Sequence, residues 1–120
     1  MTQKQEVGRL GEQEAADYLV KKGYKVIERN YRKKWGELDI VAKAPDRTLV
    51  FVEVKAGGGY PFNPEENLTR AKLRKLQRTA SIYANAKPDL VKDAKGWRID
   101  LVAVDWSRGP DPDIRHYENI

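Results

Sequence analysis

Two apolar runs most constrain the fold of this chain, because acidic residues interrupt segments that otherwise look fully buried. The first run is Gly36-Glu37-Leu38-Asp39-Ile40-Val41-Ala42, and the second is Leu49-Val50-Phe51-Val52-Glu53-Val54-Lys55. Until Glu53 the second run is apolar on both faces, which is typical of a strand inside a sheet. Pro45-Asp46-Arg47 supplies turn residues between the runs, so we expect an internal β-hairpin.

The register of this hairpin determines its chemistry. A turn centred on Asp46 places Asp39 opposite Glu53, and alternation predicts that Glu37, Asp39 and Val41 share one face while Leu38, Ile40 and Ala42 share the other. Two half-buried carboxylates in such a pair destabilise a sheet unless a positive charge lies between them. Lys55, on the face of Glu53, is one source of that charge.

A divalent cation would compensate the pair better than Lys55. Carboxylate oxygens favour hard ions, so the sequence predicts Mg²⁺ or Mn²⁺ bound by Asp39 and Glu53. The competing interpretation is a hairpin whose carboxylates lie at a solvated edge and pair with lysines.

Composition restricts the remaining possibilities. With 120 residues, 40% of them hydrophobic and 34% charged, the chain is expected to form one globular domain, 1–120, and no membrane span. The N-terminal residues show no apolar run after their charges, which predicts a cytoplasmic protein. The absence of cysteine and the single histidine argue against thiolate zinc sites and against Ser-His or Cys-His catalysis.

Residues 7–22 contain few helix breakers and end before Gly23, so we expect a helix. Glu12 shares a face with Ala15, Ala16 and Leu19, which predicts that it faces the core. It would then be a third carboxylate beside Asp39 and Glu53, although a rim position with its stem along apolar neighbours is the alternative.

Positive charge gathers in two segments, and the net charge of +5 favours an anionic partner. The first segment follows a strand expected over residues 24–29. The second lies on a helix expected to begin at Asn63 or Thr69 and to end at Ala86, with an apolar stripe at Leu73, Leu76, Ala80 and Tyr83. Phosphate binding competes with plain solvation for both segments. The candidate nucleic-acid-binding residues are Arg32, Lys33, Lys34, Arg70, Lys72, Arg74, Lys75 and Arg78.

The other segments carry weaker signals. The glycine-rich residues 56–62 are expected to be irregular, residues 97–106 to form a strand, and residues 114–117 to add an edge strand. Asp100 lies in the first of these strands without an acidic or lysine partner nearby, so we interpret it as structural. His116, in the edge strand, is expected at the surface.

The order of these features resembles the PD-(D/E)xK nuclease superfamily, in the arrangement of archaeal Holliday junction resolvases. More closely, four motifs resemble those of the YraN-like family of small bacterial proteins. They are Gly8-Arg9-Leu10-Gly11-Glu12, Arg29-Asn30-Tyr31-Arg32, Gly36-Glu37-Leu38-Asp39-Ile40-Val41-Ala42 and Phe51-Val52-Glu53-Val54-Lys55. The resemblance implies an α/β, restriction-endonuclease-like fold, with a mixed β-sheet flanked by α-helices.

The resemblance also implies roles for individual residues. Asp39 and Glu53 would hold the metal, Glu12 would assist in the metal shell, and Lys55 would orient water or stabilise charge on a phosphate. One departure stands out, because the family usually has a basic residue shortly after the lysine, where this chain has Ala56-Gly57-Gly58.

These observations lead to two hypotheses from different classes. The first is a Mg²⁺- or Mn²⁺-dependent endonuclease acting on DNA, at branched or repair structures, for which a symmetric homodimer would suit cleavage of two strands. The second is a nucleic-acid-binding module that keeps the fold without useful catalysis. A third and lower-ranked hypothesis is an assembly protein with no role in nucleic-acid binding.

Overall fold

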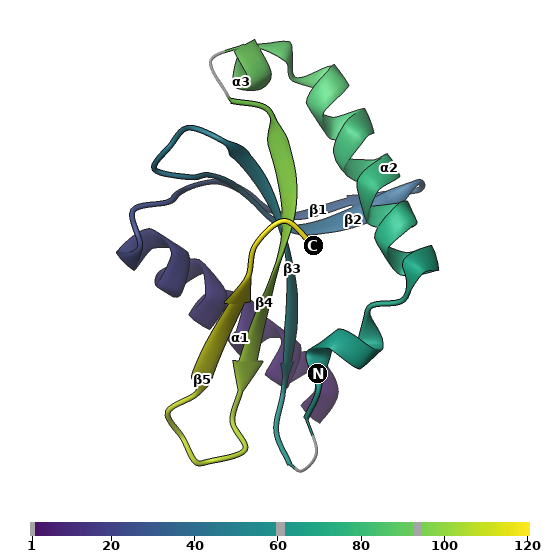
Figure 1. Cartoon of the computed structure of the whole chain (residues 1–120). Coiled ribbons are helices and arrows are strands. Elements are labelled where there is room, and N and C mark those ends of the chain that lie inside the picture. The colour runs from purple at the N-terminus through teal and green to yellow at the C-terminus, as the bar shows by residue number, and fades with distance from the viewer. Residues whose placement is uncertain (1, 60–61, 93–94) are drawn as a thin grey trace.

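Five strands form one mixed sheet in the computed structural model, which describes residues 2–59, 62–92 and 95–120. The elements in chain order are α1 (Gln3–Lys21), β1 (Lys25–Lys33), β2 (Gly36–Lys43), β3 (Leu49–Gly57), a 3-10 helix (Pro64–Asn67), α2 (Arg70–Ala86), α3 (Pro88–Lys92), β4 (Trp97–Asp105) and β5 (Asp113–Tyr117). Figure 1 shows α1 and α2 on opposite sides of the sheet. This confirms the predicted α/β architecture of a mixed sheet flanked by helices.

The strand order is sequential, from β1 to β5. All neighbouring strands are antiparallel except β3 and β4, which run parallel because the chain crosses over through α2 between them. The predicted hairpin of residues 36–55 is present as β2 and β3, and Ile40 pairs with Val52 in the expected register. Within the described residues, no helix has both the length and the apolar character needed to cross a membrane.

Each face of the sheet has its own core. Ile40, Val50 and Val52 pack with α1, whereas Val41 and Phe51 pack with α2 through Tyr83. The predicted apolar stripe of α2 therefore faces the sheet. The edge strand β5 pairs with β4 as expected.

Several predicted boundaries were wrong, each because of a helix cap or a strand pairing that the structure shows. Helix α1 begins earlier than predicted, because Thr2 and Gln5 form a capping box at its start. Strand β1 continues to Lys33, since its basic end still pairs with β2. Strand β3 runs on to Gly57 beside β4, so the first part of the segment predicted to be irregular is strand. Tyr60 and Pro61 of that segment lie outside the described residues.

The second helical region does begin twice, as its two start signals predicted. The 3-10 helix Pro64–Asn67 comes first, and α2 then begins after Thr69, whose side chain accepts a hydrogen bond from the Lys72 backbone amide. The short helix α3 after Lys87 was not predicted, because Lys87-Pro88-Asp89 was interpreted only as the end of α2.

The predicted faces of β2 were wrong from Asp39 toward the hairpin tip, so Asp39 does not share a face with Val41: it lines a cavity on the α1 side. Leu38 packs on the α2 side together with Val41, whereas Ile40 packs on the α1 side. The alternation breaks at Asp39, which lies across from Asn30 between the pairs Arg29–Ile40 and Tyr31–Leu38. Asn30 adopts a φ of 56°, a left-handed conformation that asparagine tolerates better than most residues. The β1–β2 hairpin therefore bends at Asn30 and Asp39. Its tip projects sideways toward α2 in Figure 1.

Candidate active site at the split between β2 and β3

Asp39 lies where β2 and β3 separate. The backbone pairing between these strands ends at Ile40 and Val52, and beyond it the Asp39 Oδ2 atom accepts a hydrogen bond from the Val54 backbone amide at 2.8 Å. A side chain thus replaces the next backbone contact across the gap. The bend at Asn30 and the hydrogen bond from the Val54 amide to Asp39 together position the site.

Glu53 projects from β3 into the same gap. Its carboxyl group lies close enough to that of Asp39 for the charge of Asp39 to raise its pKa, in keeping with the register of the hairpin. Lys55, two residues further along β3, places its Nζ atom 3.3 Å from Glu53 Oε1. The two carboxyl groups and one ammonium group therefore form a compact cluster.

Burial and mutual repulsion disfavour the charged forms of these acids. Burial, followed by the charge of Asp39, raises the pKa of Glu53 to about 7, although Lys55 opposes this shift. Burial also raises the pKa of Asp39, while the hydrogen bond from Val54 opposes the shift. A proton or a cation between the two groups would relieve this repulsion.

Glu12 approaches the cluster from α1, and it is buried as predicted. Its Oε1 atom lies 3.7 Å from Arg29 Nε, and neither atom has a hydrogen-bond partner among the described residues. Burial and then the charge of Asp39 raise the pKa of Glu12, so the field of Asp39 reaches this third acid. Across residues 2–59, 62–92 and 95–120, however, no three acidic or histidine side chains converge on one point.

The donor set still fits a hard divalent ion. Asp39 and Glu53 provide adjacent carboxylate oxygens, and Mg²⁺ is commonly bound by one or two carboxylates with water in the remaining positions. Glu12 lies too far from a shared position to act as a third direct ligand in this arrangement, so its contact with the ion would run through water.

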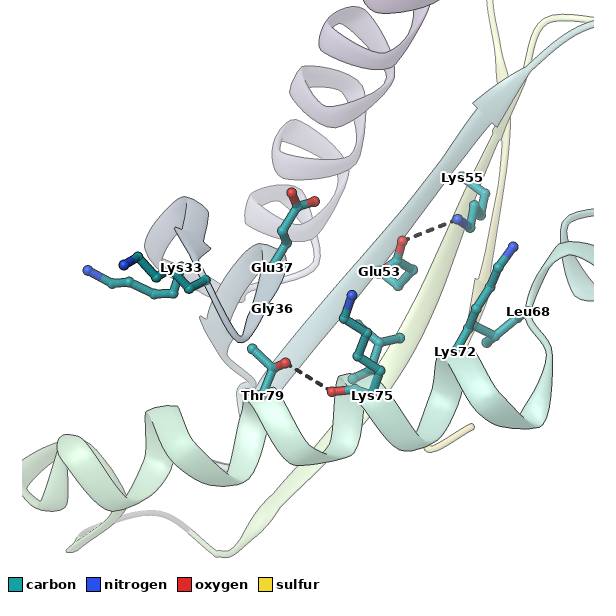
Figure 2. A pocket seen from close by; sticks show the side chains of 11 residues that line it. Lys33, Gly36, Glu37, Glu53, Lys55, Leu68, Lys72, Lys75 and Thr79 are labelled. Carbon is teal, nitrogen blue, oxygen red and sulfur yellow. Dashed lines mark hydrogen bonds and ion pairs between the residues drawn. The ribbon is translucent and has the colours of Figure 1, made fainter.

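A cavity of about 370 Å³ opens on the α2 side of the pair; we call it the lysine cavity. It is lined by Lys33, Lys34, Gly36, Glu37, Glu53, Lys55, Leu68, Lys72, Lys75, Leu76 and Thr79. Figure 2 shows Lys72 and Lys75 rising from α2 toward the strand that carries Glu53, whereas Lys33 extends from the hairpin away from it. In the described part of the chain, none of the lysines from α2 or the hairpin tip forms an ion pair.

A second cavity, of about 380 Å³, opens on the α1 side; we call it the arginine cavity. Its lining residues are Gln5, Gly8, Arg9, Glu12, Arg29, Asn30, Arg32, Asp39, Val54 and Ala56. Because Asp39 lines this cavity and Glu53 lines the lysine cavity, the acid pair lies between the two.

The structure divides the predicted basic residues into two groups. Arg32 lines the arginine cavity, and Lys33, Lys34, Lys72 and Lys75 line the lysine cavity. The row Arg70, Arg74 and Arg78 is exposed on α2 and lines neither cavity. Helical geometry explains most of the division, because Lys72 lies about 120–160° and Lys75 about 60–140° from the three arginines around α2.

Sequence reasoning missed the α1 wall of the arginine cavity, which includes Gly8 and Arg9. A signal for Gly8 was present, since it lies four residues before Glu12 and therefore on the same helical face. Arg29 was noted only as part of a basic segment, and its approach to Glu12 follows from the pairing of β1 with β2.

Asp100 does not belong to this site, and its surroundings are those of a structural residue. It is fully buried, 2.9 Å from Arg98 Nε and 2.8 Å from His116 Nε2, and it accepts a hydrogen bond from the Asn119 backbone amide. The prediction that His116 lies at the surface was wrong, because its side chain is only 4% exposed beneath Tyr18 of α1.

Comparison with known proteins gives one consistent family. The model of the uncharacterised protein family UPF0102 matches residues 11–104. A UPF0102 protein from Clavibacter michiganensis is 42% identical over 115 residues, covering 95% of this chain and 94% of the relative. A UPF0102 protein from Thermotoga neapolitana is 41% identical over 112 residues, covering 93% and 94%. One from Trichlorobacter lovleyi is 39% identical over 116 residues, covering 96% and 89%.

Proposed function

Because the chain belongs to UPF0102, the YraN-like family that its motifs resemble and one described only as uncharacterised, we propose a function from the site itself. In this proposal, the chain is a Mg²⁺- or Mn²⁺-dependent nuclease-like protein of the cytoplasm that hydrolyses phosphodiester bonds in DNA. One observation carries the proposal: Asp39 and Glu53 lie close enough for the charge of Asp39 to raise the pKa of Glu53, between two cavities lined by basic residues.

Asp39 and Glu53 would hold the ion, and Glu12 would contact it through water. When bound, such an ion lowers the pKa of a coordinated water and neutralises charge on a phosphate. Lys55 keeps its ammonium group beside Glu53, where it stabilises negative charge that develops on a phosphate oxygen. The lysines of α2 hold the strand by its phosphates.

The sharpest variant for this proposal is Asp39→Asn. Asparagine retains an oxygen that can accept the hydrogen bond from Val54, so the strand contact survives while the charge is lost. We expect cleavage of linear, nicked and four-way DNA with Mg²⁺ or Mn²⁺ to fall by at least about a hundredfold, in line with the loss of several kcal/mol of transition-state stabilisation. Asp17→Asn, on the exposed side of α1, is the matched control and should cut like the unaltered protein.

Thermal melting tests metal binding without relying on activity. Mn²⁺ should raise the melting temperature of the unaltered protein and of Asp17→Asn, because a ligand at about 100 times its Kd stabilises the native state by about 2.7 kcal/mol. Asp39→Asn should lose this rise. Undiminished cleavage by Asp39→Asn, or an equal Mn²⁺ shift in all three proteins, would rule out the proposed site.

A second candidate function is nucleic-acid binding without turnover. Two observations favour it: the lysines of α2 and of the hairpin tip, which form no ion pair within the described residues, and the uncharged Ala56-Gly57-Gly58 after Lys55, which supplies no further cation to hold a phosphate there. This candidate predicts binding that weakens steeply with salt and no cutting of any DNA form with either metal.

A further inference from the structure

Gly8 is the least explained residue of the arginine cavity. It lies inside α1, where glycine is the least favourable residue apart from proline. Packing does not require it, because a Cβ atom added there would meet nothing within 4 Å. Gly11, three residues later, is different: its added Cβ would collide with the Ala56 side chain. The wall at Gly8 is thus flat on its solvent side, which is what close approach of a ligand requires.

Guanidinium groups surround this flat wall. Arg9 pairs with Glu6 and Arg32 pairs with Glu37, but all four side chains are well exposed, so these pairs are weak and can exchange for a ligand. Arg29 Nε, by contrast, is buried without a hydrogen-bond partner among the described residues. Arginine forks match the paired oxygens of a phosphate.

The acids of the cavity set the position of an anion within it. Glu12 and Asp39 make its inner end negative, next to the metal-binding pair. An anion is therefore favoured away from the two acids, beside Gly8 and Arg9. Arg32 lines the same cavity and lies near enough to both acids to lower their pKa values, so it can reach the anion from the side of the acids. The lysine cavity offers positive charge on the opposite side of the pair.

We propose that the arginine cavity binds a backbone phosphate of the nucleic-acid strand whose neighbouring phosphodiester lies at Asp39 and Glu53. This inference rests on the proposed function and specifies its substrate: one strand that crosses the split in the sheet and is held by phosphates on both sides. Gly8 allows the strand to approach the helix backbone, and Arg32 contacts the phosphate.

The test is binding of a short fluorescent single-stranded oligodeoxynucleotide, with a chelator present so that no cleavage occurs. Gly8→Ala should raise the melting temperature by roughly 2–4 °C, because alanine favours the helix, and should still weaken binding by roughly fivefold. Asn85→Ala, an exposed position of α2 outside both cavities, is the matched control; it should also favour the helix and leave binding unchanged.

Charge variants give an independent reading of the same site. Arg32→Gln should lower the slope of log K against log salt by about 0.7, as expected for the loss of one contact to single-stranded DNA. Arg108→Gln, which removes an equal charge from the exposed turn between β4 and β5 outside both cavities, should leave the slope unchanged.

The outcomes separate this inference from the proposed function. If Gly8→Ala and Arg32→Gln bind like the unaltered protein while Lys72→Gln and Lys75→Gln bind weakly, the phosphate site is refuted and the nuclease proposal stands. An equal loss in Arg32→Gln and Arg108→Gln refutes it as well, since it indicates only diffuse attraction. Failure of the unaltered protein to bind refutes the phosphate site alone, because the nuclease proposal is tested separately by metal-dependent cleavage.

Discussion

Glu53 combines burial with a close acidic neighbour, and this makes its ionisation costly in the folded state. Its folded pKa of about 7 lies above the value of about 4.3 expected in the unfolded chain. The folded protein therefore binds more protons than the unfolded chain between these values. Glu53 should favour folding at low pH, and that advantage should be lost as the pH rises through about 7.

Glu53→Gln tests this sign directly. The variant should be more stable than the unaltered protein at pH 8, by on the order of 2 kcal/mol, and close to it at about pH 4, below the unfolded pKa, because glutamine has no charge to bury. Denaturant unfolding at the two pH values measures the difference. Glu37→Gln, an exposed acid of the same hairpin, is the control and should show little change at either pH. Equal effects of Glu53→Gln at both pH values would contradict the raised pKa.

The acid pair could be predicted from sequence, whereas the backbone conformation around it could not. Asp39 and Glu53 stood out because alternation and turn position placed them opposite each other. The alternation itself fails at Asp39, because the left-handed Asn30 lies across from it. A period-two pattern contains no information about the backbone conformation of one residue on a neighbouring strand.

At the scale of elements, α1 carries two glycines with opposite requirements. Gly11 lets α1 approach β3, since a Cβ atom there would overlap the Ala56 Cβ. Gly11→Ala should therefore destabilise the protein by about 1–3 kcal/mol, as overpacking does. Gly8→Ala should stabilise it by about 0.5–1 kcal/mol. Chemical denaturation of the two variants measures both changes, and destabilisation by both would show that Gly8 is also a packing residue.

The tip of the β1–β2 hairpin also packs closely against α2. A Cβ atom at Gly36 would overlap Thr79 Oγ1 and approach its other side-chain atoms. Gly36→Ala should cost about 1–3 kcal/mol, and Thr79→Ala in the same chain should recover part of this loss by removing the overlapped oxygen. Additive costs in the double variant, measured by denaturation, would argue against a direct contact.

Elements with strong local signals were predicted best. The β2–β3 hairpin, the main helices and the strand 97–106 each had a clear period together with turn or cap residues. The start of α1 was missed although its capping box is local, but the other main errors fell where a tertiary contact decided the outcome. The basic end of β1 is strand only because β2 lies beside it, and His116 is buried only because α1 covers β5. Neither neighbour can be read from the local sequence.

At the scale of the whole molecule, Asp100 joins distant parts of the chain. It ties β4 to His116 in β5 and to the backbone of Asn119 near the C-terminus. Burial alone would raise its pKa, but the hydrogen bonds from His116 and Arg98 outweigh burial and lower it. Its contribution is therefore present above the unfolded pKa of about 3.9 and lost as the pH falls through the lower folded value.

Asp100→Asn should be among the most damaging single changes. It leaves Arg98 without its buried partner, and breaking a buried pair costs about 3–5 kcal/mol. Asp105→Asn, on the same strand, is the control, since its pair with Arg115 lies nearer the surface and should cost less than about 1 kcal/mol. Thermal and denaturant unfolding compare the two, and similar losses would contradict a special role for Asp100.

The hydrogen bond from the Val54 amide to Asp39 has a consequence for both the strands and the proposed ion. One oxygen of Asp39 joins the two strands at the point where their backbone pairing stops. A carboxylate oxygen that accepts one hydrogen bond keeps a second lone pair, so the proposed ion would either share this oxygen with the Val54 amide or use the other one. The carboxylate proposed to hold the ion is thus also the group that keeps β2 and β3 in register beyond Ile40 and Val52.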